Sequence, residues 1–220
     1  MDSSLNLAQK FIVWALPVMF AITLHEVAHG WAACVLGDTT AKKLGRLSLN
    51  PLKHVDPLGT VLLPCMLLLM GGFMFGWAKP VPVDTRNLKN PRVDMALVAL
   101  AGPAANLAMA LGWGLLFKIA LSTGAQQGVW YGLGLMGQAG LIVNVSLMVL
   151  NMLPLPPLDG GRVLMGLLPE SMARSFSRIE PYGFFILIGL AYTGVLGALM
   201  QLPSNISFSV IGRMLGLDLI

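Results

Sequence analysis

Four long apolar segments divide this sequence. Each is at least about 20 residues long with few charged side chains, which is the length a helix needs to cross the hydrocarbon core of a bilayer. We therefore predict four transmembrane helices, at Leu7–Leu36, Val93–Leu121, Val129–Met152 and Tyr182–Leu202. The remaining stretch, Ser204–Ile220, is predicted to be a short tail with the character of an interfacial helix.

The segment Pro57–Phe75 is also apolar, but it differs from the four predicted spans. It contains Pro64 and the pair Gly71-Gly72, and it is barely long enough to cross a bilayer. Basic residues flank it about equally, and Lys and Arg concentrate on the cytoplasmic side of membrane proteins. We therefore favour a re-entrant element over a true span. Together with the residues that follow, it is expected to form a re-entrant or β-hairpin element around residues 57–83.

The stretch Trp77–Val83 is expected to be extended. It contains two prolines two residues apart, which exclude both a helix and a central β-strand. Because the backbone of an extended chain alternates with period two, the prolines leave the N–H groups of the other edge available. Those donors belong to Lys79, Val81 and Val83. Two interpretations stay open, an edge strand and a stiff polyproline-like linker.

The composition is typical of a multi-pass membrane protein. Hydrophobic residues make up 56% of the chain and charged residues 11%, whereas a soluble domain carries about 25% charged residues. The fold class we predict is an all-α integral membrane protein with a single membrane-embedded domain over residues 1–220. The net charge of +4 is spread over loops, which supports contact with anionic lipid rather than with nucleic acid. Cys34 and Cys65 are expected to be small buried hydrophobes.

The distribution of Lys and Arg orients the predicted spans. The loop Ser122–Gly128 carries no charge, as expected of an external loop, whereas Arg162, Arg174 and Arg178 mark a cytoplasmic end. This order places the N-terminus outside. The end of the first span, the start of the second and the end of the third then meet at the cytoplasmic side.

A polar cluster interrupts the first apolar segment. His25, Glu26 and His29 form the pattern H-E-x-x-H, and in a helix the two histidines lie one turn apart on the same face. Two imidazoles at that spacing can bind one Zn²⁺, with Glu26 beside them as a candidate general base for a zinc-activated water. Ionisable residues in a membrane helix are costly unless they are paired or metal-bound. The alternative is an interfacial helix end whose histidines simply meet water.

A catalytic zinc site needs a third protein ligand. Among the acidic residues near predicted cytoplasmic span ends, Asp159 is distinctive because prolines precede it and two glycines follow it. Those residues fix an irregular backbone at membrane depth. An Asp-Gly turn that caps the following helix is the alternative interpretation. The other acidic candidates are Asp38, Asp56, Asp84 and Asp94.

Three motifs occur together in the chain. They are His25-Glu26-Val27-Ala28-His29, Gly102-Pro103-x-x-Asn106, and Asn151-x-x-Pro154-x-Pro156-Pro157-Leu158-Asp159-Gly160-Gly161. In combination they resemble the site-2 protease family of intramembrane zinc metalloproteases, in its compact bacterial form without a PDZ or CBS domain. The resemblance implies that His25, His29 and Asp159 hold one Zn²⁺ per chain. It also implies that Glu26 activates the water.

The resemblance further implies roles for residues outside the metal site. Asn106 and Asn151 are expected to bind substrate, to stabilise the oxyanion or to position the metal site, and His54 is a candidate accessory residue. The expected substrate is a membrane protein with a transmembrane segment, cleaved within or near that segment in regulated intramembrane proteolysis. The active site is expected towards the cytoplasmic side of a bacterial inner or plasma membrane. The extended stretch after residue 76 is a candidate for pairing with unwound substrate by β-addition.

Two other classes of function compete with this enzyme. One is a zinc-binding membrane protein that does not hydrolyse, such as a transporter or a scaffold, against which the intact Glu26 argues. Few charges occur in the other predicted spans, so a transport path has little support. The other is a purely structural membrane subunit in which the H-E-x-x-H pattern is accidental.

Overall fold

A computed structural model of the chain describes residues 6–62 and 78–219. Within these ranges the regular elements are all helices, which agrees with the predicted all-α class. Four of the helices are long and apolar enough to cross a membrane. The protein is therefore a multi-pass integral membrane protein.

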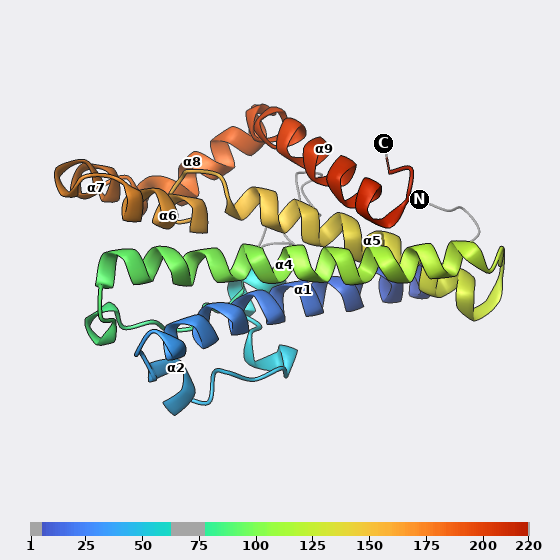
Figure 1. Cartoon of the computed structure of the whole chain (residues 1–220), viewed down its shortest axis with the longest axis horizontal. Coiled ribbons are helices and arrows are strands. Elements are labelled where there is room, and N and C mark those ends of the chain that lie inside the picture. Colours follow the sequence, from blue (N-terminus) through green and yellow to red (C-terminus); the bar gives the residue numbers. More distant parts are fainter. Residues whose placement is uncertain (1–5, 63–77, 220) are drawn as a thin grey trace.

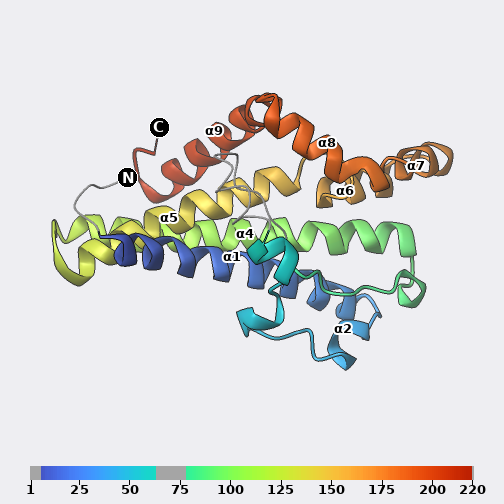
Figure 2. The same ribbon diagram turned by 180° about the vertical axis from the view of Figure 1, so that it is seen from behind.

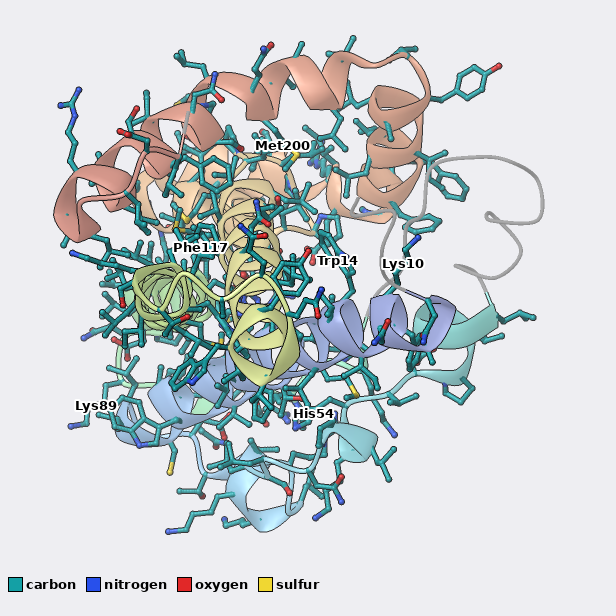
Figure 3. All side chains as sticks on the ribbon, turned by 90° about the vertical axis from the view of Figure 1, so that its right-hand side faces the viewer. Lys10, Trp14, His54, Lys89, Phe117 and Met200 are labelled. Carbon is teal, nitrogen blue, oxygen red and sulfur yellow. The ribbon has the colours of Figure 1, made fainter. Side chains whose placement is uncertain are left out.

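Three long helices form the centre of the molecule. They are α1 (Leu7–Val35), α4 (Pro91–Ser122) and α5 (Gly128–Asn151), and each contacts the other two. Figure 3 looks almost along α4 and α5, with α1 on one side of them and the C-terminal helices on the other. All three helices agree with the predicted spans to within two residues at each end, because each apolar run ends at polar or turn-forming residues.

Two helices in succession, α5 and then α6 (Asp159–Leu167), pack along α4. Part-way along α4, α5 ends, and after an irregular connection the short helix α6 continues along it (Figures 1 and 2). Gly166 allows close contact, because a Cβ built at that position would lie 2.5 Å from the Cβ of Ala96 on α4. The end of α6 is thereby held against the first turns of α4.

The predicted fourth span at Tyr182–Leu202 is wrong. The chain forms α8 (Glu180–Tyr192), turns at Gly194, and forms α9 (Val195–Leu215), which is the fourth helix capable of crossing a membrane. Gly194 has φ +76°, a left-handed conformation that glycine adopts readily and that interrupts a helix. The expected interfacial tail is wrong as well, because α9 includes most of it and continues through Pro203.

Close packing of small residues joins α4 to α5. A Cβ built at Gly140 would lie 2.3 Å from the Trp113 ring, and one at Gly137 would lie 2.7 Å from the backbone nitrogen of Phe117, which Figure 3 labels. In membranes, helices associate through such close approach rather than through the hydrophobic effect. A buried apolar cluster then connects α4 and α5 to α9, and its members are Ala110, Leu141, Val145, Val149 and Ile211.

Most of the described residues between α1 and α4, in the ranges 36–62 and 78–90, lie on the side of α1 away from α9 (Figures 1 and 3). It contains α2 (Thr40–Lys43), the 3-10 turns η1 (Pro51–Lys53) and η3 (Thr85–Asn87), and the π-helical turn η2 (Pro57–Leu62). Residues 78–84 have no regular secondary structure. The centre of the predicted element around residues 57–83 and the prediction for Cys65 lie outside the described residues. The last short helix, α7 (Glu170–Ser177), joins α6 to α8.

Candidate metal centre

His25, His29 and Asp159 come together at the centre of the bundle. One ligand atom from each lies within 4.8 Å of the others. The Nε2 atoms of the two histidines are 3.0 Å apart, and Asp159 Oδ2 lies 3.2 Å from His25 Nε2 and 3.3 Å from His29 Nε2. His25 lies about 15 Å along the helix axis from the end of α1, at about 1.5 Å per residue. The cluster is therefore well inside the bundle rather than at its rim.

Hydrogen bonds behind the two imidazoles determine which nitrogen carries a proton. His29 Nδ1 lies 2.7 Å from the carbonyl oxygen of Val98, and His25 Nδ1 lies 2.6 Å from Asn106 Oδ1. Both of these partners are acceptors, so each Nδ1 must be the donor. In the neutral ring each Nε2 then carries a lone pair, which is the state that binds a metal.

With both rings neutral, three acceptor atoms face one another, namely the two Nε2 atoms and Asp159 Oδ2. Asp159 Oδ2 is buried and has no hydrogen-bond donor among the described residues. Such an arrangement is repulsive unless a cation lies at its centre. In a tetrahedral site with ligands about 2.0–2.1 Å from Zn²⁺, the ligand atoms lie about 3.3 Å apart. The observed separations of 3.0, 3.2 and 3.3 Å match that spacing, so these residues fit zinc.

Gly102 on α4 makes room for the two imidazoles. A Cβ built there would lie 2.4 Å from His29 Nε2 and 2.6 Å from His25 Cε1. The α4 backbone thus forms one wall of the metal centre, and any side chain at this position would occupy the space of the ligands. In the sequence this glycine stood out only as part of the motif Gly102-Pro103-x-x-Asn106.

Asn106 lies behind His25 rather than beside the three converging ligand atoms. It is fully buried, and its Nδ2 contacts Asn144 Oδ1 at 2.9 Å and the Ala21 carbonyl oxygen at 3.4 Å. Asn144 is also fully buried and donates to the Gly140 carbonyl oxygen at 2.8 Å. Since both N–H groups of Asn106 have protein partners, none is left for a substrate oxyanion in this arrangement. The geometry favours the predicted alternative in which Asn106 positions the metal site.

Asn144 is a residue whose role sequence reasoning missed. Its place in the middle of a long apolar helix was a usable signal, because an unpaired amide at that depth is costly.

We expect Asn144→Ala to weaken zinc binding about 10- to 100-fold, because the Asn106 amide that orients His25 loses its partner. Titration with a competing chelator measures this. Gln138→Ala, an exposed amide on the same helix, should bind zinc like the wild type. An unchanged affinity in Asn144→Ala would contradict the role.

Glu26 lies one residue after His25 and is half-buried. Its Oε2 accepts a hydrogen bond of 2.8 Å from the backbone N–H of Val81. The extended segment before α4 therefore crosses α1 at the candidate base. This pairing joins residues far apart in sequence, and only the fold reveals it.

The other two predicted site residues have local hydrogen bonds. Asn151 Nδ2 donates to the Leu147 carbonyl oxygen at 3.0 Å, within its own helix. His54 is buried on the side of α1 away from α9 (Figure 3), and its Nε2 donates to the Ser48 carbonyl oxygen at 2.8 Å. Neither residue belongs to the group able to hold a metal among the described residues. Their functional roles stay predictions.

Comparisons with known proteins agree with this chemistry. The family described as Peptidase family M50 matches residues 114–192, a range that includes Asp159. YwhC of Bacillus subtilis (strain 168), which is named a zinc metalloprotease, is 40% identical over 195 residues, covering 83% of this chain and 80% of its own. Rip2 of Mycolicibacterium smegmatis, also named a zinc metalloprotease, is 32% identical over 81% of this chain and 66% of its own. No solved structure matches the chain.

Proposed function

Because this chain belongs to peptidase family M50 and is a zinc metalloprotease with several membrane-spanning helices, we propose that it cleaves other membrane proteins. The cleaved bond lies within or near a transmembrane segment of the substrate, in regulated intramembrane proteolysis. One observation carries this proposal. His25, His29 and Asp159 lie together about 15 Å from the end of α1, a helix long enough to cross a membrane, so we expect them within the bilayer interior.

In this proposal His25, His29 and Asp159 hold one zinc ion per chain. Bound zinc supplies Lewis-acid chemistry, which makes water a stronger acid and a peptide carbonyl a better electrophile at neutral pH. Asn106 and Asn144 hold the His25 ring from behind, and the Val98 carbonyl holds His29. The protein thereby presents two Nε2 atoms and one carboxylate oxygen in fixed positions. Residues 1–220 act as a single membrane-embedded domain around them.

Glu26 serves as the general base. Its carboxylate takes a proton from the water that attacks the scissile carbonyl, and the same proton then passes to the leaving amine as the C–N bond breaks. One carboxylate oxygen is already occupied by the Val81 N–H, which leaves the other for the water. The adjacent position of Glu26 and His25 in the chain keeps the base beside the metal ligands.

Asn151 is the remaining candidate for a substrate contact, because Asn106 has no free donor. For that role its amide must leave the Leu147 carbonyl or use its oxygen, which has two lone pairs. Substrate pairing by β-addition along Lys79 and Val81 is disfavoured. The Lys79 N–H already donates to the His54 carbonyl oxygen at 2.9 Å, and the Val81 N–H donates to Glu26.

The test uses the purified chain and a model membrane-spanning peptide. We expect about one zinc per chain, and cleavage that a chelator abolishes and added zinc restores. A protein that binds stoichiometric zinc without cleaving any spanning peptide would instead support the non-hydrolysing alternative. A protein that binds no zinc would support the structural subunit.

A further inference from the structure

We propose that Arg46 and the extended residues 79–81 form a backbone clamp that orients the Glu26 carboxylate. Arg46 is then a positioning residue for the reaction, although it is not in contact with the metal ligands. This inference rests on the proposed role of Glu26 as the base. It follows from three sets of contacts that converge on Val81.

The first set is made by the Arg46 side chain. Its Nη1 donates to the Lys53 carbonyl oxygen at 2.6 Å, and its Nη2 donates to the carbonyl oxygens of Lys79 at 2.9 Å and Pro80 at 3.2 Å. A guanidinium group is planar and presents several donors in a fixed fork, so one side chain can hold three carbonyls in a defined geometry. Arg46 thus ties the loop after α2 to the residue just before Val81.

The second set fixes the ends of the extended segment. At its start, the Lys79 N–H donates to the His54 carbonyl oxygen at 2.9 Å, and at its end the Asp84 N–H donates to Asp38 Oδ2 at 2.7 Å. Asp38 is fully buried just after α1. Burial alone raises the pKa of Asp38, but hydrogen bonds from Thr40, Asn87 and the Asp84 amide outweigh it and lower the pKa. An ionised carboxylate therefore holds this end.

The third set seats the segment on α1. A Cβ built at Gly30 would lie 2.5 Å from Leu47 Cδ2 and 2.7 Å from Val81 Cγ1. Because Gly30 has no side chain, Leu47 and Val81 can pack directly against the α1 backbone at this position, which is one helical turn after Glu26. Val81 is 7% exposed in this position. Its N–H reaches Glu26 Oε2 at 2.8 Å because the side chain enters this gap.

These contacts give protein partners to the polar backbone groups from Lys79 to the N–H of Val81. Both carbonyls at positions 79 and 80 accept from Arg46, Pro80 has no N–H, and the two neighbouring N–H groups are bound to His54 and Glu26. Such a segment is suited to holding a neighbouring group still rather than to pairing with substrate. Glu26 has several rotatable bonds, and a fixed N–H selects one orientation of its carboxylate. Misplacement of a catalytic group by about 1 Å can cost about 100-fold in rate.

Arg46→Ala tests the clamp in the zinc-loaded protein. We expect kcat for a model membrane-spanning peptide to fall about tenfold or more, with KM within about threefold of wild type and about one zinc per chain retained. Hydrogen exchange of the Val81 amide should become faster. Arg46→Lys, which keeps the charge but cannot bridge three carbonyls, should give an intermediate kcat. Lys89→Ala is the control, because that basic residue lies in the same connection and is exposed, and its kcat should match the wild type.

Several outcomes would overturn the clamp. They are an unchanged kcat in Arg46→Ala, a change confined to KM, and a loss of zinc in both Arg46 variants, which would mean that Arg46 supports the metal site instead. Glu26→Gln measured in parallel separates this inference from the proposed function. If Glu26→Gln cleaves normally, the general base is wrong. If Glu26→Gln is inactive while Arg46→Ala is fully active, only the clamp is wrong.

Discussion

Glu26→Gln is expected to reduce cleavage by at least about 100-fold while about one zinc per chain stays bound. Glutamine keeps the size of the side chain and an oxygen that accepts the Val81 N–H, so the extended segment should stay in place. It cannot take a proton from water, and general-base catalysis is typically worth about 10²–10⁴-fold. The measurements are kcat/KM for a model spanning peptide and the metal content of the same sample.

A matched control for this variant is Glu180→Gln. Glu180 is an exposed residue at the start of α8, so the same chemical change there should leave cleavage and zinc content at wild-type levels. Normal cleavage by Glu26→Gln would exclude Glu26 as the base. Loss of zinc from Glu26→Gln would show that the carboxylate supports the metal site, and the assignment of a purely catalytic role would fail.

The central helices, and the convergence of His25, His29 and Asp159, could be predicted because their signals are local. Apolar runs with polar ends define α1, α4 and α5, and the spacing of His25 and His29 places both on one helix face. Asp159 could be predicted because prolines and glycines around it indicated an irregular backbone. The structure places it at the first residue of α6, against the two histidines.

The division between α8 and α9 could not be predicted from hydropathy. The apolar run continues through Gly194 without a charged residue. The mean hydropathy of a segment does not distinguish a glycine in a helix from one with φ +76°. A glycine inside a predicted membrane helix is common, so its presence alone did not indicate a turn. The break depends on the conformation of one residue, and it moves the fourth span towards the C-terminus by more than two helical turns, at about 3.6 residues per turn.

The residues that support the site were missed because their roles depend on contacts between distant segments. Asn144 acts on His25 only through Asn106, across three different helices. Arg46 reaches the carbonyls of residues 79 and 80 across more than thirty positions. Spacing along the chain shows which residues share a helix face, but it does not show which face of a second helix lies opposite.

The largest effect on the metal centre is expected from Gly102→Ala. The added Cβ would lie 2.4 Å from His29 Nε2, 2.5 Å from His29 Cε1 and 2.6 Å from His25 Cε1. These distances are far below ordinary van der Waals contact of about 3.5–4.0 Å. The α4 backbone is packed against α1 on one side and against α5 and α6 on the other, so it has little room to retreat. The imidazoles must therefore move apart from Asp159, and we expect zinc to be lost and cleavage to fall below detection.

Metal content after purification and a chelator titration measure this effect, with Asp159→Ala as the reference for a site that lacks one ligand. Gly112→Ala is the matched control on the same helix, since a Cβ there meets nothing within 4 Å. That variant should keep zinc and activity, and it should be slightly stabilised because alanine favours a helix over glycine by about 1 kcal/mol. Stoichiometric zinc in Gly102→Ala would mean that the histidines do not approach α4 as closely as this structure shows, and the ligand geometry would need revision.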